Sequence, residues 1–148
     1  IPGQRDSDRA LTAEGRKRLR DVLATAGAAE VSPDLILASP YKRAQETAAI
    51  AADVLGYRRN VESTDVLVPD SSPEEVWEEI RLWRDARQLL LASHEPLMSA
   101  TLAYLLGCRQ LLVEFKKGAI ARVDIDRFGP APYGVLRWLL TPKLAGER

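Results

Sequence analysis

Two short stretches of the sequence share a pattern that is typical of an anion-binding site. Residues 37–40 (Leu-Ala-Ser-Pro) and residues 91–96 (Leu-Ala-Ser-His-Glu-Pro) each follow a short apolar run with small polar residues and a proline. When a strand of a parallel sheet passes directly into a helix, the helix begins at the carboxyl edge of the sheet, where open α/β sheets bind ligands. The unpaired N–H groups of such a helix start favour anions. The pattern therefore predicts a site for an anion such as a phosphate group.

Arg43 and His94 are the side chains of these stretches that are suited to contact phosphate. Arg43 lies one turn into the helix expected after Ser39, with Thr47 on the same face, and a guanidinium can hold two phosphate oxygens at once. His94 stands at the end of the second apolar run. A lone histidine is more often structural, and an isolated helix arginine is more often simply exposed. Their equivalent positions after two predicted strands favour the functional interpretation.

Several other chemistries are excluded by residue type and spacing. The sequence has no Gly-x-Gly and no Gly-Lys-Ser/Thr, so it lacks a dinucleotide fingerprint and a nucleotide-binding phosphate loop. A cysteine-based phosphatase would need an arginine six residues after its cysteine, but Glu114 occupies that position after Cys108. One histidine and one cysteine cannot form a His/Cys zinc site or an internal disulfide. We therefore expect neither a metal nor an organic cofactor.

The composition indicates one domain that spans residues 1–148, of which 46% are hydrophobic and 28% charged. The 21 basic and 21 acidic residues cancel, which argues against nucleic acid or an anionic membrane as a partner. The apolar segment 97–106 is shorter than the roughly 20 residues that cross a bilayer. We therefore expect a cytoplasmic monomer.

Hydrophobic periodicity predicts strands alternating with helices, followed by further strands. The apolar runs at 35–38 and 89–92 suit strands that are buried on both faces. The order predicts an α/β fold in which C-terminal strands add antiparallel pairing. Helices are expected from Thr12 to Gly27, from Ser39-Pro40 to Gly56, from Pro73 onward and from Pro96 to Gly107, and further strands at 61–63, 112–115, 119–125 and 135–140.

Four segments together resemble the histidine phosphatase superfamily, and specifically the SixA-type phosphohistidine phosphatases. The resemblance implies a phosphoglycerate-mutase-like three-layer fold, with a mostly parallel central sheet flanked by helices. It extends through nearly the whole chain, and the second segment is the most specific. The segments are Asp8–Gly15, Ser39–Thr47, Ser93–Pro96 and Phe115–Ala119.

The family resemblance also implies a mechanism. In such enzymes a histidine of an Arg-His-Gly or Arg-His-Ala motif, at the end of the first strand, attacks phosphorus and becomes phosphohistidine, and water then releases phosphate. Arg43 resembles the pocket arginine and His94 the second pocket histidine, so both are expected to be catalytic and to bind phosphate. Arg9 matches an arginine of the loop before the first helix and is a further expected phosphate contact. Arginines and an imidazolium would neutralise the phosphoryl oxygens.

The chain departs from this family pattern in one respect. The Arg-His motif is absent, and His94 is the only histidine. The predicted elements also begin with a loop and a helix, without the strand that a βα fold would place first. One interpretation is that the first strand and its nucleophilic histidine lie upstream of Ile1. The alternative is a non-catalytic relative that binds phosphate or a phosphoprotein.

The segment 57–87 has room for one strand, one loop and one helix, which leaves little for a lid. An open site suits a phosphohistidine on a protein surface, and for SixA-like proteins the implied substrate is the phosphotransfer domain of a signalling relay. A small-molecule phosphatase of the same superfamily is a further alternative. Asp70 and Glu95 are candidates for a general acid, but the sequence favours neither.

Overall fold

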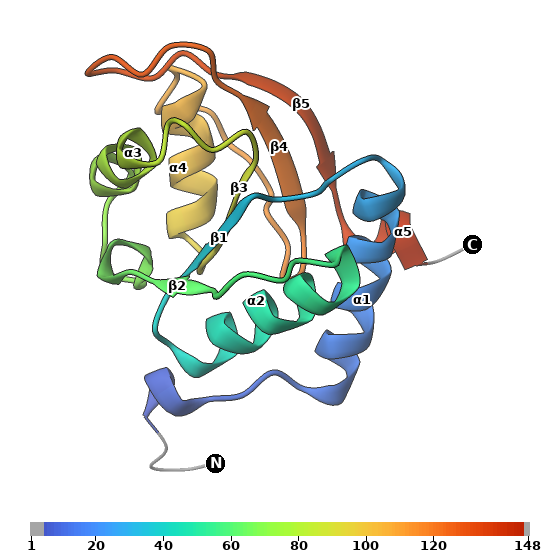
Figure 1. Cartoon of the computed structure of the whole chain (residues 1–148). Coiled ribbons are helices and arrows are strands. Elements are labelled where there is room, and N and C mark those ends of the chain that lie inside the picture. The colour runs from blue at the N-terminus through green and yellow to red at the C-terminus, as the bar shows by residue number, and fades with distance from the viewer. Residues whose placement is uncertain (1–4, 147–148) are drawn as a thin grey trace.

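The computed structural model describes residues 5–146, which form two sheets with helices around them (Figure 1). The first sheet is parallel with strand order β2-β1-β3, and the second is the antiparallel pair β4-β5. This arrangement confirms the predicted α/β fold with antiparallel pairing at the C-terminal end. The strands are β1 (Leu35–Ala38), β2 (Glu62–Ser63), β3 (Leu89–Ala92), β4 (Ile120–Asp124) and β5 (Val135–Leu140).

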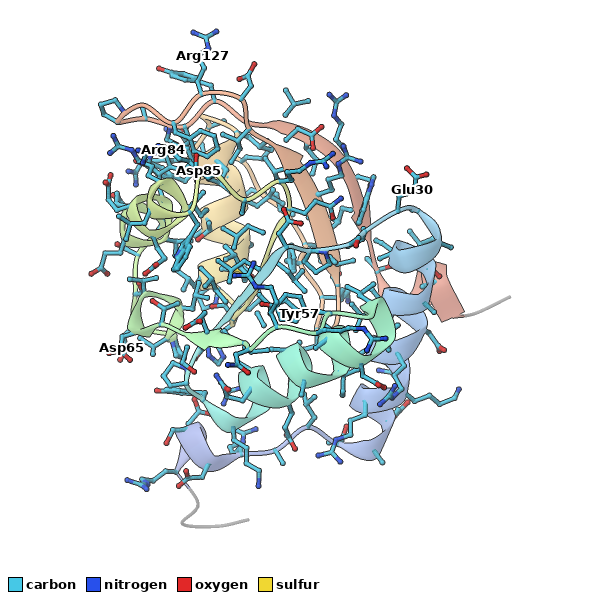
Figure 2. All side chains as sticks on the ribbon, viewed as in Figure 1. Glu30, Tyr57, Asp65, Arg84, Asp85 and Arg127 are labelled. Atoms are coloured by element: carbon cyan, nitrogen blue, oxygen red, sulfur yellow. The ribbon has the colours of Figure 1, made fainter. Side chains whose placement is uncertain are left out.

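Helices cover both faces of the parallel sheet and give three layers. Alternate residues of β1 point to opposite faces. Ile36 and Ala38 pack into a cluster with residues of the first two helices, whereas Leu35 and Leu37 pack against the third and fourth. Tyr57, labelled in Figure 2, packs against the cluster formed with the first two helices, and its hydroxyl accepts the Ile36 N–H at 3.3 Å. The helices are α1 (Ala13–Ala28), α2 (Lys42–Leu55), α3 (Pro73–Leu82), α4 (Leu97–Leu105) and α5 (Pro142–Gly146), and single 3₁₀ turns form η1 (Asp6–Asp8) and η2 (Asp65–Leu67).

Local signals set most of the helix ends as predicted. The Thr12 hydroxyl accepts the Gly15 N–H at 3.0 Å and caps α1, and Pro73 occupies the first turn of α3. Gly56 ends α2 with φ 70°, in the left-handed region that favours glycine. The start of α2 is a correction, because the helix begins at Lys42 and Tyr41 occupies the N-cap. The Ser39 hydroxyl accepts the Tyr41 N–H in a turn that precedes the helix.

The prediction of a strand at residues 112–115 is wrong. These residues have no regular secondary structure, and 95% of Leu112 is exposed to solvent. The segment has the apolar composition of a strand but lacks a neighbouring strand to accept its backbone hydrogen bonds. The other C-terminal strands are confirmed as β4 and β5, whereas α5 was not predicted.

The outer edge of β3 is unpaired. β3 bonds to β1 on one side, and its other edge makes no backbone hydrogen bond to residues 5–146. Figure 1 shows β4 and β5 beyond this edge, on the side away from β2, and β4 pairs only with β5. All four residues of β1 are buried, but Leu89, Leu90 and Leu91 of β3 are half-buried, which corrects the expectation for the second strand. Between residues 5 and 12 no strand precedes α1, and residues 1–4 of the expected opening loop lie outside the described residues.

None of the helices formed by residues 5–146 combines the length and the apolar character that crossing a membrane requires.

Candidate functional site

The two strand-to-helix junctions lie side by side. β1 and β3 are parallel and pair Ala38 with Ala92, so both strands end at the same edge of the sheet. The Ser39 N–H then donates to the Ala92 carbonyl at 3.0 Å. This bond places the residues after β1 directly against the residues after β3, including His94.

His94 is held by the first junction. Its side chain is buried, and its Nε2 lies 2.8 Å from the Oγ of Ser39, which is fully buried. Ser39 Oγ already accepts the Tyr41 N–H at 3.2 Å, so its own proton is available to Nε2. When the hydroxyl donates to Nε2, Nδ1 carries the proton of the neutral imidazole. The edge of the His94 ring meets Tyr41, with 5.0 Å between the ring centroids.

Arg43 contacts the same aromatic ring, that of Tyr41. It is in the first turn of α2, and its guanidinium carbon is 5.4 Å from the centroid of the Tyr41 ring. Arg43 and His94 therefore lie on the same side of the molecule and contact the same aromatic ring. Thr47 lies one turn further along this helix and donates its hydroxyl to the Arg43 carbonyl at 2.8 Å, which agrees with the expectation that the two residues share a face.

Arg43 and Arg9 share one carboxylate. The Arg43 guanidinium donates to both Asp6 carboxylate oxygens, at 3.1 and 3.2 Å, and to the Asp6 backbone carbonyl at 2.8 Å. Arg9 donates to one of the same carboxylate oxygens at 3.3 Å. All three candidate phosphate contacts thus gather around one end of α2, where Figure 1 also shows η1. The sequence analysis missed Asp6, although its spacing of three residues from Arg9 is a signal for an ion pair.

Burial makes His94 hard to protonate. Loss of hydration and, secondarily, the positive charge of Arg43 lower the pKa of His94 from 6.5 to about 4, and the Asp6 carboxylate opposes this shift. The imidazole is therefore neutral near pH 7. This corrects the expected imidazolium, because burial of the ring outweighs the attraction of the nearby carboxylate. A neutral His94 has one ring N–H, and the positive charge of the site comes from the arginines.

Two further residues, which the sequence analysis did not identify, hold this arrangement together. The Gln45 amide donates to the Ser39 carbonyl at 2.8 Å and to the Ser63 hydroxyl at 2.9 Å, so it ties the turn after β1 to β2. Glu46 accepts the Leu11 N–H at 2.8 Å and thereby fixes the loop that carries Arg9 against α2. Both lie close to Arg43 in sequence, but their partners are 6 to 35 residues away.

The remaining candidates lie elsewhere. The Glu95 carboxylate accepts the Ser99 N–H at 2.6 Å and so bonds to the first turn of α4, and Asp70 is exposed in the loop before α3. The glutamates of α3 are largely exposed to solvent. Trp77 is fully buried in the core, whereas Trp83 is 38% exposed. Across residues 5–146, no three His, Cys, Asp or Glu side chains come together in a way that could hold a metal ion.

Comparison with known proteins finds similarity to one superfamily in the N-terminal part of the chain. Residues 2–67 match the model of the histidine phosphatase superfamily (branch 1). A solved structure of the protein histidine phosphatase SixA complexed with tungstate is 26% identical, and the match covers 96% of this chain and 90% of that chain with a TM-score of 0.85. No curated protein matches the sequence.

Two more distant structures share the fold. A candidate phosphohistidine phosphatase SixA from Agrobacterium tumefaciens is 22% identical over 96% of this chain and 89% of that chain, with a TM-score of 0.79. A candidate alpha-ribazole-5'-P phosphatase from Escherichia coli K-12 is 20% identical over 91% of this chain and 86% of that chain, with a TM-score of 0.70. The chain therefore has the phosphoglycerate-mutase-like fold and resembles the SixA-type histidine phosphatases.

Proposed function

Because the chain resembles the SixA-type histidine phosphatases, we propose that the protein is a hydrolase that removes phosphate from a phosphohistidine on another protein. The observation that carries this proposal is that Arg43 and His94 contact the same Tyr41 ring, after the ends of two adjoining parallel strands. The position at the carboxyl edge of the sheet is where such folds bind ligands. One positive and one neutral donor there suit a phosphoryl group.

Each side chain has a separate part in the proposed reaction. Phosphoryl transfer depends mainly on positioning and on stabilising the charge of the equatorial oxygens. The Arg43 guanidinium would bind two of these oxygens, and Arg9 would add a second positive charge from the loop. His94, neutral and fixed by Ser39, would donate its remaining N–H to the phosphoryl group. Phosphohistidine has a labile P–N bond, so the reaction places less demand on a strong general acid.

We propose that the nucleophile is a histidine at the end of a further strand, upstream of Ile1, that pairs with the outer edge of β3. The unpaired edges of β3 and β4 support this placement, since a strand between them would join the two sheets. If that strand runs parallel to β3, it ends at the same sheet edge as His94. The histidine would attack phosphorus to form phosphohistidine, and water would then release phosphate.

A protein substrate is favoured over a small metabolite by the shape of the chain around the site. Between Tyr57 and Arg87 the structure has only β2, η2, α3 and their connections. None of these is an inserted lid, which would be needed to enclose a small substrate. We propose that the substrate is the phosphotransfer domain of a signalling relay and that the protein acts as a monomer in the cytoplasm.

The decisive experiment measures phosphate release by the full-length gene product. A phosphorylated phosphotransfer domain should be hydrolysed faster than sugar phosphates at equal concentration. Arg43→Ala should remove most of the activity, whereas Arg20→Ala, which removes an exposed arginine paired with Asp53, should leave it unchanged. Faster hydrolysis of the sugar phosphates would favour a small-molecule phosphatase instead, and equal effects of the two substitutions would place the pocket elsewhere.

Binding without turnover is the second candidate. It is favoured by the single histidine of the chain, whose Nε2 is already bonded to Ser39. A binding module would retain a phosphorylated protein without releasing phosphate and without forming a phosphoenzyme. Acid-labile labelling of the full-length protein by the phosphorylated substrate would exclude this candidate.

A further inference from the structure

We propose that Asp6 is a built-in competitor of the phosphate group: its carboxylate holds the Arg43 guanidinium, and an anion binds there only after η1 releases it. This inference concerns regulation of the site described above and rests on the proposed phosphate binding. It assigns a role to a loop residue that neither the motifs nor the resemblance identified.

The contact between Asp6 and Arg43 has the geometry of anion binding. Two guanidinium nitrogens face the two carboxylate oxygens at 3.1 and 3.2 Å, in the fork arrangement that arginine also uses for phosphate. Arg43 also donates to the Asp6 backbone carbonyl, so both terminal nitrogens of the guanidinium are hydrogen-bonded to this one residue. Arg9 points to the same carboxylate. The carboxylate thus occupies the place between two arginines that a phosphate group needs.

The contact is also suited to opening. η1 is a single 3₁₀ turn with no buried residue and no side-chain cap, and about half of the Asp6 side chain is exposed. After η1 the chain is held at Leu11, whose N–H bonds to Glu46, and at Thr12, which caps α1. The Asp6 carboxylate is half exposed, so water can hydrate it on release, and η1 can be displaced without unfolding α1 or α2.

Displacement changes the charge that the site presents. With Asp6 in place, one carboxylate offsets the charge of Arg43 and is shared with Arg9. After its release, two guanidinium groups face the anion. Competition of this kind lowers the apparent affinity in proportion to the fraction of molecules in which Arg43 is free. A ligand with two negative charges, such as a phosphoryl group, gains more from the open state than a ligand with one.

The test is titration calorimetry of the full-length gene product with inorganic phosphate at fixed, low ionic strength. Asp6→Asn keeps the shape of the side chain but removes the competing charge, and we expect it to tighten phosphate binding about tenfold. Asp8→Asn is the matched control, because it removes a carboxylate of the same turn that forms an ion pair with Arg5 at 3.2 Å. General screening of a neighbouring charge predicts only about a twofold change for this control. Backbone amide shifts of residues 5–10 on addition of phosphate report release of the turn.

The outcomes separate the competitor from the proposed function. A gain of about tenfold for Asp6→Asn, with a smaller gain for Asp8→Asn, supports the competitor. Equal gains for the two variants, with phosphate bound in both, overturn it and leave the proposed function standing. Phosphate binding by neither the wild type nor Asp6→Asn overturns both. Arg43→Gln should abolish binding in the Asp6→Asn background, and retained binding would mean that the anion is held elsewhere.

Discussion

His94 should remain neutral down to about pH 4, which makes the folded protein less stable in mild acid. The unfolded chain binds a proton at His94 near pH 6.5, whereas burial lowers the pKa of the folded state to about 4. Between these values the unfolded state binds more protons, so stability is lost as the pH falls through this window. The difference of roughly 2.5 pKa units corresponds to an upper bound of about 3 kcal/mol, of which about 2 kcal/mol is lost between pH 7 and pH 5.

Two measurements check this prediction. His94 is the only histidine, so one imidazole resonance followed against pH gives its pKa directly. Urea unfolding of the wild type and of His94→Gln gives the free energy of unfolding at each pH, and the difference between the two proteins removes the contribution of the carboxylates. The wild type should lose about 2 kcal/mol more than the variant between pH 7 and pH 5. A resonance that titrates at 6.5 or above, or a difference that does not vary with pH, would refute the argument that burial outweighs the nearby carboxylate.

Three further substitutions test the packing around the site and the core. Ser39→Ala leaves a buried imidazole nitrogen and a backbone N–H without their partner, so it should cost about 1–3 kcal/mol in urea unfolding and alter the ¹⁵N shifts of the imidazole. Gly134→Ala would place a Cβ 2.5 Å from a valine methyl of β4 and should cost about 1–3 kcal/mol, whereas Gly129→Ala meets nothing within 4 Å and should be nearly neutral in the same assay. Trp77→Ala should lower the free energy of unfolding by about 3–5 kcal/mol, because the side chain is fully buried, and Trp83→Ala by clearly less; similar losses would mean that α3 is oriented differently.

The elements that the sequence predicted correctly are those with strong local signals. The apolar run that forms β1 is buried on both faces. Thr12 begins α1 because its side chain caps a backbone N–H, and Gly56 ends α2 because glycine readily adopts the left-handed conformation. The sequence does not fix the start of α2, because Ser39 and Pro40 suit both the first residues of a helix and a turn before it. The choice depends on the buried contact between Ser39 and His94, which joins residues that are 55 positions apart.

The predicted side chains of the candidate site come together, but their electrostatics could not be predicted from the sequence. The parallel pairing of β1 and β3 explains why Arg43 and His94 meet, since it aligns the two junctions. The protonation state of His94 depends on burial, which no motif encodes. The contact between Asp6 and Arg43 spans 37 residues, so the spacing of charges in the loop gave no indication of it.

The half-buried leucines of β3 have a consequence for handling the protein. Along its outer edge β3 has backbone N–H and C=O groups without a partner among residues 5–146, and apolar side chains lie beside them. An extended segment of another molecule can pair with such an edge. The short length of β3 limits this tendency, but neither a charged residue nor a proline within Leu89–Ala92 blocks it. The 148-residue chain at high concentration should therefore self-associate through this strand, whereas the full-length protein should not, because we propose that an upstream strand pairs with this edge.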